Sequence, residues 1–213
     1  MSEVSTPSLS DIRADLLDWL CRDDCTPQKA DWCIRRGLKR LNRDLRIPAM
    51  ETDLVLSPTS ADEPLVSIDL PELDTFLAII RLEADGYPYK PAPLDVMPQG
   101  STRCFNNGRY FARDLRTLVL GSPARQWVRL VYYKAFPSMF ADTDTSDVLI
   151  YAYDALLFAA LAQAGDVFAM PDNVQQAWEA KYQREVMQLN AVAQTLDTLG
   201  GPIAVSNADH YPT

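Results

Sequence analysis

The stretch VRLVYYKAFPSMF, residues 128–140, marks a change from one kind of secondary structure to another. It begins as a strand rich in β-branched and aromatic residues, and it places Tyr132 beside Tyr133, so their side chains point to opposite faces of a sheet. Pro137 then ends the strand, and the following DTDTSDV (142–148) offers helix-capping residues. We interpret 128–140 as the return from a β-rich insertion into a helical domain, with one tyrosine in the sheet core and the other pointing out.

Upstream of the insertion, the pattern predicts two helices joined as a hairpin. Ser8 or Ser10 can cap the first helix, and Thr26 caps the second, with Pro27 at its first position and Pro48 as its stop. Both helices carry apolar residues at the helical spacing of 3.6. These residues are Ile12, Leu16, Leu17 and Leu20 in the first helix, and Ala30, Ile34, Leu38, Leu41 and Leu45 in the second.

Between residues 53 and 134 the pattern changes to a period of two, interrupted by turn residues. It predicts five or six short strands in a small sheet or barrel. Asp85-Gly86 predicts a hairpin, and Asn107-Gly108 predicts a second tight turn. TLVLGSP (117–123) and QWVRLVYYK (126–134) are expected to form a further antiparallel pair.

Two more helices are predicted downstream. DVLIYAYDALLFAALAQAGD (147–166) is apolar on nearly every face, so it must be covered on all sides. The last helix, 172–199, is expected to be capped by Asp172 and ended by Gly200-Gly201. Its apolar stripe consists of Val174, Trp178, Tyr182, Val186, Leu189, Ala193 and Leu196.

These patterns together predict a mainly α fold: a helical bundle of about four helices interrupted by a small antiparallel sheet or barrel-like insert. The predicted organisation is an N-terminal arm (1–9), a helical hairpin (10–52) and a helical pair (141–200) that form one bundle, a β-rich insertion (53–140) and a flexible C-terminal tail (201–213).

The residues that catalysis would need are largely missing. His210 is the only histidine, so Ser-His-Asp and Cys-His nucleophiles are excluded unless the C-terminal tail folds back. Neither a G-x-x-x-x-G-K nor a G-x-G-x-x-G loop is present to hold phosphates. We therefore expect no enzyme and no cofactor.

The four cysteines, at positions 21, 25, 33 and 104, contain no C-x-x-C pair. We expect buried, reduced thiols rather than a structural metal site, in a protein made in the cytoplasm. The opening MSEVSTPSLSDIRADL is polar, and the sequence lacks a long apolar run, so neither export by a standard signal nor membrane insertion is expected.

Charge is distributed unevenly along the chain. The net charge is −9, but residues 29–46 carry seven basic and two acidic residues, a balance of +5 that leaves −14 for the rest. The basic helix can present a plain solvated face, pair with an acidic face of the same chain or a neighbour, or follow the phosphates of DNA. Pairing with a neighbouring copy makes Arg36, Arg40 and Arg43 candidate subunit-interface residues.

Three stretches of the chain, in this order, resemble the head–tail adaptor (connector) proteins of tailed bacteriophages. They are WCIRRGLKRLNRDLRIPAMETDLVL (32–56), RLVYYKAFPSM (129–139) and IYAYDALLFAALAQAGDVFAMPDNVQQAWEAKYQREVMQLN (150–190), which together cover about half of the chain. The spacing of Trp178 and Tyr182 fits the family, whereas Tyr153 stands where the family often has a proline.

The resemblance implies a structural virion protein in the neck between head and tail, with usually about twelve copies forming a ring beneath the portal that extends the DNA channel. The implied partners are the portal protein, further copies of the chain, tail or nozzle proteins, and genomic DNA that passes through the lumen without sequence-specific binding. The apolar tail residues Pro202, Ile203 and Val205, with Tyr211, are candidate contacts to the portal or another partner.

Two alternatives to the head–tail adaptor stay open. One is another ring subunit of the neck or of tail completion, which would share the ring but not the portal contact. The other is a phage DNA-binding or packaging accessory that uses the basic helix 29–46.

Overall fold

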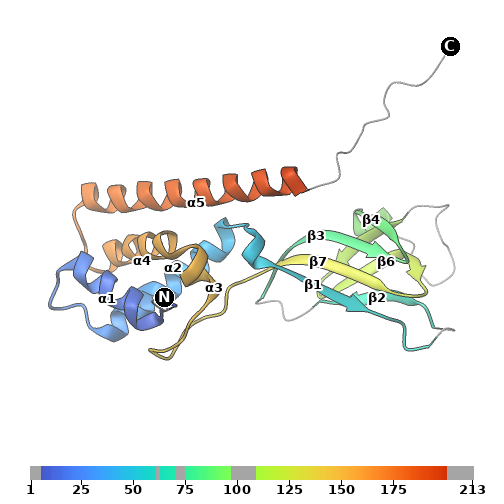
Figure 1. Cartoon of the computed structure of the whole chain (residues 1–213), viewed down its shortest axis with the longest axis horizontal. Helices are drawn as coiled ribbons and strands as arrows, with labels where there is room; N and C mark the ends of the chain where they lie inside the picture. Colours follow the sequence, from blue (N-terminus) through green and yellow to red (C-terminus); the bar gives the residue numbers. More distant parts are fainter. Residues whose placement is uncertain (1–5, 61–62, 71–74, 97–108, 201–213) are drawn as a thin grey trace, which may run out of the picture.

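The computed structural model describes residues 6–60, 63–70, 75–96 and 109–200. These residues form a helical part and a curled sheet, which lie next to each other along the long axis of the molecule (Figure 1). The chain enters the sheet after its second α-helix and returns to the helical part after the last strand.

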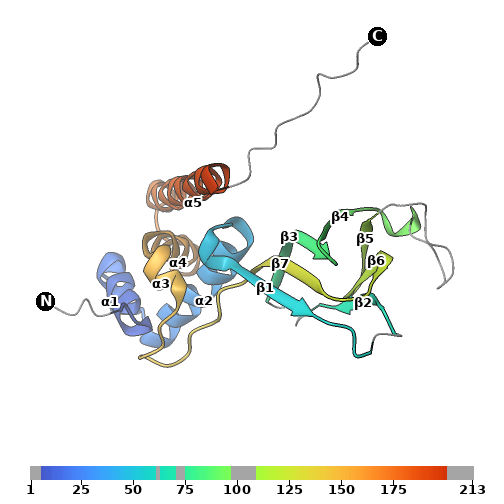
Figure 2. The same ribbon diagram turned by 45° about the vertical axis from the view of Figure 1, so that its right-hand side comes forward.

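The helical part is built around one central helix. α4 packs against α1, α2 and α5, and all its residues from Ala155 to Leu161 are buried, as its all-round apolar sequence predicts. α5 crosses α4 on one side, whereas α1 and α2 lie on the other (Figures 1 and 2). The helices are α1 (Leu9–Leu20), α2 (Pro27–Asp44), α3 (Asp147–Tyr151), α4 (Tyr153–Val167) and α5 (Asp172–Gly200).

The predicted helix starts at Ser8 and Thr26 are confirmed. The Ser8 N–H donates to the Asp11 carboxylate at 2.8 Å, and the Thr26 hydroxyl accepts the N–H of Lys29 at 3.4 Å. The single helix expected over 147–166 is wrong, because Ala152 leaves the helical conformation (φ −144°, ψ 34°) and separates α3 from α4.

The strands form one seven-stranded sheet in the order β1-β7-β3-β4-β5-β6-β2, which curls into a half-barrel. Neighbouring strands are antiparallel except β4 and β5, which pair in parallel at Lys90↔Tyr110 and Pro91↔Phe111. The strands are β1 (Glu51–Leu56), β2 (Leu65–Asp69), β3 (Phe76–Ala84), β4 (Tyr87–Pro91), β5 (Tyr110–Asp114), β6 (Thr117–Ala124) and β7 (Val128–Lys134), with short 3-10 helices at η1 (Pro48–Met50) and η2 (Leu94–Val96).

The predicted fold class, a mainly α bundle with a small antiparallel insert, is wrong. The protein is 46% helix and 27% strand. The concave face of the sheet has a hydrophobic core of its own, in which Ile68, Leu82 and Leu118 are almost completely buried. Because seven strands enclose this second core, the sheet is a layer of the fold in its own right rather than an appendage of a bundle.

The strand pairings were predicted only in part. The hairpin at Asp85-Gly86 is confirmed: both residues have positive φ, 51° and 81°, as a tight turn between β3 and β4 requires. The predicted β6–β7 pair is wrong, since β6 pairs with β5 and β2 while β7 pairs with β1 and β3. The predicted turn at Asn107-Gly108 lies outside the described residues.

Tyr132 and Tyr133 connect the two cores. Tyr132 stacks on Phe76 inside the sheet, with ring centroids 5.2 Å apart, whereas Tyr133 packs against the helical core. The prediction of opposite faces is therefore confirmed, but the outward tyrosine is covered by the helical part. Just beyond β7, the Asn42 amide of α2 donates to the Phe136 carbonyl at 3.1 Å and accepts the Phe136 N–H at 3.0 Å.

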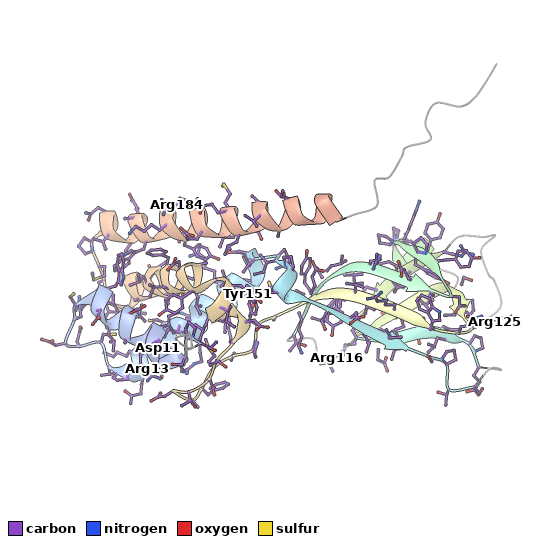
Figure 3. All side chains as sticks on the ribbon, viewed as in Figure 1. Asp11, Arg13, Arg116, Arg125, Tyr151 and Arg184 are labelled. Carbon is purple, nitrogen blue, oxygen red and sulfur yellow. The ribbon has the colours of Figure 1, made fainter. Side chains whose placement is uncertain are left out.

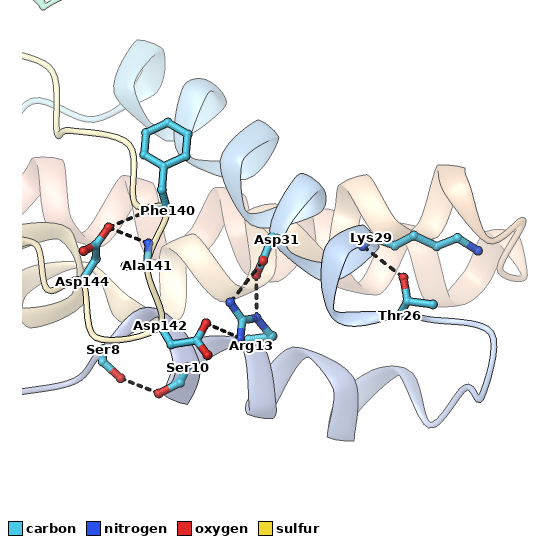
Figure 4. A network of polar contacts seen from close by, with 10 residues as sticks. All are labelled: Ser8, Ser10, Arg13, Thr26, Lys29, Asp31, Phe140, Ala141, Asp142 and Asp144. Carbon is cyan, nitrogen blue, oxygen red and sulfur yellow. Dashed lines mark hydrogen bonds and ion pairs between the residues drawn. The ribbon is translucent and has the colours of Figure 1, made fainter.

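The loop that leads from β7 to α3 is held by charged side chains (Figure 4). Arg13 of α1 contacts Asp31 of α2 at 2.6 Å and Asp142 of the loop at 2.8 Å. The Asp144 carboxylate accepts the N–H groups of Phe140 and Ala141, and these bonds hold its pKa below the ordinary value. The loop therefore has a defined path along α1 and α2.

Candidate assembly surfaces

α2 has two contrasting faces. Its inner face packs against α4, and Gly37 allows the two helix backbones to come close. Its outer face carries four cations, Arg36, Lys39, Arg40 and Arg43, which we call the basic face. Together with Gln163 of α4 they line a surface depression of about 430 Å³.

Arg40 already has partners within the chain. Its guanidinium contacts the Glu179 carboxylate of α5 through two hydrogen bonds, at 2.7 and 2.5 Å, and lies 4.2 Å from the ring centroid of Tyr182. The bond from Arg40 holds the pKa of Glu179 below its ordinary value, although partial burial of the carboxyl opposes this. Arg40 thus joins α2 to α5, which is one of the alternatives that the charge pattern of the sequence left open: pairing with an acidic residue of the same chain.

The other cations of the basic face are exposed. Arg36 lies over the ring of Trp32, one helical turn before it, with 4.4 Å between the guanidinium carbon and the ring centroid. Within the part of the chain that the structure describes, the Lys39 and Arg43 side chains have no ion pair or hydrogen bond. The predicted interface residues Arg36, Arg40 and Arg43 therefore do lie around one depression, and Lys39 belongs with them.

Polar side chains on α5 anchor the end of α2. The Tyr182 hydroxyl donates to Asp44 at 2.6 Å, and Asn190 accepts the Arg46 N–H at 2.8 Å while donating to the Asp44 carbonyl at 3.0 Å. Sequence reasoning did not identify Glu179, Asp44 or Asn190 as contacts. For Glu179 and Asn190, the only signal in the sequence is that they flank the apolar stripe of α5, which faces the other helices.

A second charged surface lies on α1 and the start of α4. Asp11, Asp15 and Asp18 of α1 and Asp154 of α4 are exposed, and we call them the acidic face. The Tyr153 hydroxyl donates to Asp15 at 2.6 Å. Burial, this hydrogen bond and the negative charges of Asp15, Asp11 and Asp154 all raise the pKa of Tyr153.

A third surface is an apolar groove where the helical part meets the sheet. It has a volume of about 440 Å³, and Tyr151 and Val192, which border it, are more than half exposed. Figure 3 shows Tyr151 near the junction of the two parts. The groove is lined by Ile47, Pro48, Ala49, Tyr151, Leu189, Val192 and Ala193. The predicted contact residues Pro202, Ile203, Val205 and Tyr211 lie outside the described residues.

The thiols differ from the prediction at one position. Cys25 and Cys33 are buried, and burial raises the pKa of Cys33 to about 11, but Cys21 at the end of α1 is exposed. Cys104 lies outside the described residues.

Among the residues whose positions are described, no group of three or more potential metal ligands comes together, and no helix is both long and apolar enough to span a bilayer.

Comparison with known proteins adds one strong match. A family model described as SU10 adaptor protein matches residues 7–206, which is nearly the whole chain. The match includes both the helical part and the sheet. No curated protein matches the chain.

Proposed function

The chain belongs to the SU10 adaptor protein family, a family of phage head–tail adaptors, and from this premise we propose that it forms a ring beneath the portal that joins the capsid to the tail. The expected family is thus confirmed, and the protein is a phage adaptor, a structural component of the virion that works through other virion proteins. The observation that carries the proposal is the match over both parts of the fold.

Charge supports a channel role for such a ring. The chain has a formal charge of −9, and assembly multiplies this surplus around the lumen. A lumen of negative potential repels the phosphates of DNA, so the genome can slide past without sequence-specific binding. The proposed ring is a closed cyclic arrangement of about twelve copies, the number that the resemblance to head–tail adaptors implies.

The C-terminal tail is the proposed contact to the portal. Pro202, Ile203 and Val205 form a short apolar segment directly after α5, and Tyr211 adds an aromatic side chain. A short apolar segment of this kind can bind a partner by adding a strand or by inserting its side chains into pockets.

Native mass spectrometry of the full chain mixed with the portal protein of the same phage tests the proposal. We expect a portal complex that carries about a dozen copies of the chain. Ile203→Asp with Val205→Asp should remove portal binding, whereas Thr213→Asp, at the last position of the same tail, should not. A wild-type chain that ignores the portal but forms rings alone would indicate another neck subunit instead.

A further inference from the structure

The acidic face and the basic face lie on opposite sides of the helical part. Asp154 and Gln163 border the two faces and are nine positions apart on α4, which is about two and a half turns, so they point in opposite directions. α5 shows the same division: Glu179 contacts Arg40 of α2, whereas Lys181 lies 4.7 Å from the ring centroid of Trp19 of α1. In Figure 2, both helices lie below α5, with α1 to the left of α4 and α2 to its right.

Each face has charges that its own chain leaves uncompensated. On the basic side, Glu179 pairs with Arg40, which leaves Arg36, Lys39 and Arg43 exposed. On the acidic side, Arg13, the one cation within α1, is bound to Asp31 and Asp142 rather than to the acidic face.

Figure 3 shows Asp11 on α1, on the side of the helical part away from α5. Lys181 of α5 is the cation that lies next to α1, since its ammonium group sits over the rings of Trp19 and Phe158. No carboxylate pairs with Lys181 among the ion pairs of the described residues. One lysine does not balance four aspartates, so the acidic face keeps a net negative charge.

We propose that the basic face of one copy binds the acidic face of the next copy, with Arg36, Lys39 and Arg43 opposite Asp15, Asp18 and Asp154. This inference rests on the proposed function, since it names the contact that would hold the ring together. In this contact, the carboxylates on α1 and at the start of α4 of one copy enter the depression that the basic face lines on the next copy.

The position of the two faces decides the symmetry of the contact. An isologous dimer would need both faces in one patch, because each partner must offer both charges at the same interface. When the faces lie on opposite sides, every copy uses its basic face for one neighbour and its acidic face for the other. Such a heterologous contact forms a ring when the rotation from one copy to the next closes after a full turn.

A second copy of the chain fits the basic face better than nucleic acid does. The whole chain is acidic, and the acidic face stands on the same molecule, so it would repel DNA drawn toward the basic depression. For another copy of the chain, the same acidic face is the complementary surface.

Two charge-reversal variants of the full chain test the contact by sedimentation at low salt. Lys39→Glu with Arg43→Glu changes the balance of the proposed contact residues Arg36, Lys39 and Arg43 from +3 to −1, so that both sides of the contact are acidic. Asp18→Lys with Asp154→Lys changes the balance of Asp15, Asp18 and Asp154 from −3 to +1, so that both sides are basic. None of the four replaced side chains has an ion pair or hydrogen bond within the described residues, so folding should be retained. We expect each variant alone to self-associate at least about tenfold more weakly than the wild type.

Mixing the two variants in equal amounts gives the sharper result. Every contact between a doubly acidic copy and a doubly basic copy is attractive, so the mixture should assemble with the two variants alternating. Asp95→Lys with Asp114→Lys, exposed residues of the sheet region, changes the charge as much as the acidic-face variant does and should leave association unchanged.

Several outcomes would overturn the proposal. They are a wild-type chain that stays monomeric at low salt, variants that assemble as the wild type does, and a mixture that fails to assemble. DNA binding that only the basic-face reversal removes would assign that face to nucleic acid instead. Failure of the wild type to bind the portal counts against the proposed function alone, because the contact between copies is measured without the portal.

Discussion

Replacing Gly37 by alanine should force α2 and α4 apart. A Cβ at this position would lie 2.8 Å from the backbone nitrogen of Ala160 and 3.1 Å from the carbonyl carbon of Ala159. Ordinary van der Waals contacts of a Cβ begin at 3.4 Å, so the two backbones would have to separate by 3.4 − 2.8 = 0.6 Å. Neither atom can rotate away, because both belong to the backbone of the central helix.

The expected cost follows from two opposing effects. Overpacking a well-packed core costs about 1–3 kcal/mol, whereas removing a glycine from a helix interior stabilises by about 1 kcal/mol. Because the contact is between backbones, we expect the upper part of the first range and a net loss of about 1–2 kcal/mol in the free energy of unfolding. For a chain of this size that lowers Tm by about 4 °C.

Chemical denaturation followed by circular dichroism measures this change, with Gly165→Ala as the matched control. A Cβ at Gly165 would lie 2.9 Å from Cγ of Gln175, so a side chain rather than a helix backbone has to shift, at the expense of the hydrogen bonds that Gln175 donates to the carbonyls of Gly165 and Met170. The control should therefore be clearly less destabilised than Gly37→Ala. If Gly37→Ala is as stable as the wild type, the close approach of α2 and α4 does not limit the packing and the reasoning fails.

Three further predictions concern single contacts. A double-mutant cycle of Arg40→Ala and Glu179→Ala should give a coupling energy of about 1 kcal/mol, since the pair is bidentate but partly exposed to solvent; a coupling indistinguishable from zero would contradict the contact. Mass spectrometry of thiol labelling should find Cys21 modified in the native protein and Cys33 only after unfolding, and equal rates at both sites would contradict their burial. Asp85 accepts three backbone N–H groups from 125–127, which hold its pKa below the ordinary 3.8 against the opposing effect of burial. The resulting stabilisation is present above 3.8 and lost as pH falls below it, so the unfolding free energy of Asp85→Asn should depend less on pH in that range than that of the wild type.

The roles of individual side chains were predictable only where they depend on near neighbours in sequence. The caps at Ser8 and Thr26 and the turn at Asp85-Gly86 follow from backbone geometry over three or four residues, and all three are confirmed. The partner of Arg40 is 139 positions away, and nothing near Arg40 in the sequence distinguishes it from Arg36 or Arg43. The grouping of cations on one helix face was predictable, but not which of them is already paired.

The sequence by itself determined α1, α2 and α5, the all-round burial of α4 and the opposite directions of Tyr132 and Tyr133, because periodicity and capping act within one segment. It did not show the break at Ala152 that separates α3 from α4. Only the tertiary structure decided the strand order, the parallel pairing of β4 with β5 and the size of the second core. Strands hydrogen-bond to partners anywhere in the chain, and their alternating pattern shows which side is buried but not which strand lies beside them. The placement of the acidic and basic faces on opposite sides of α4 likewise depends on how α1 and α2 pack around that helix, which no single segment of sequence encodes.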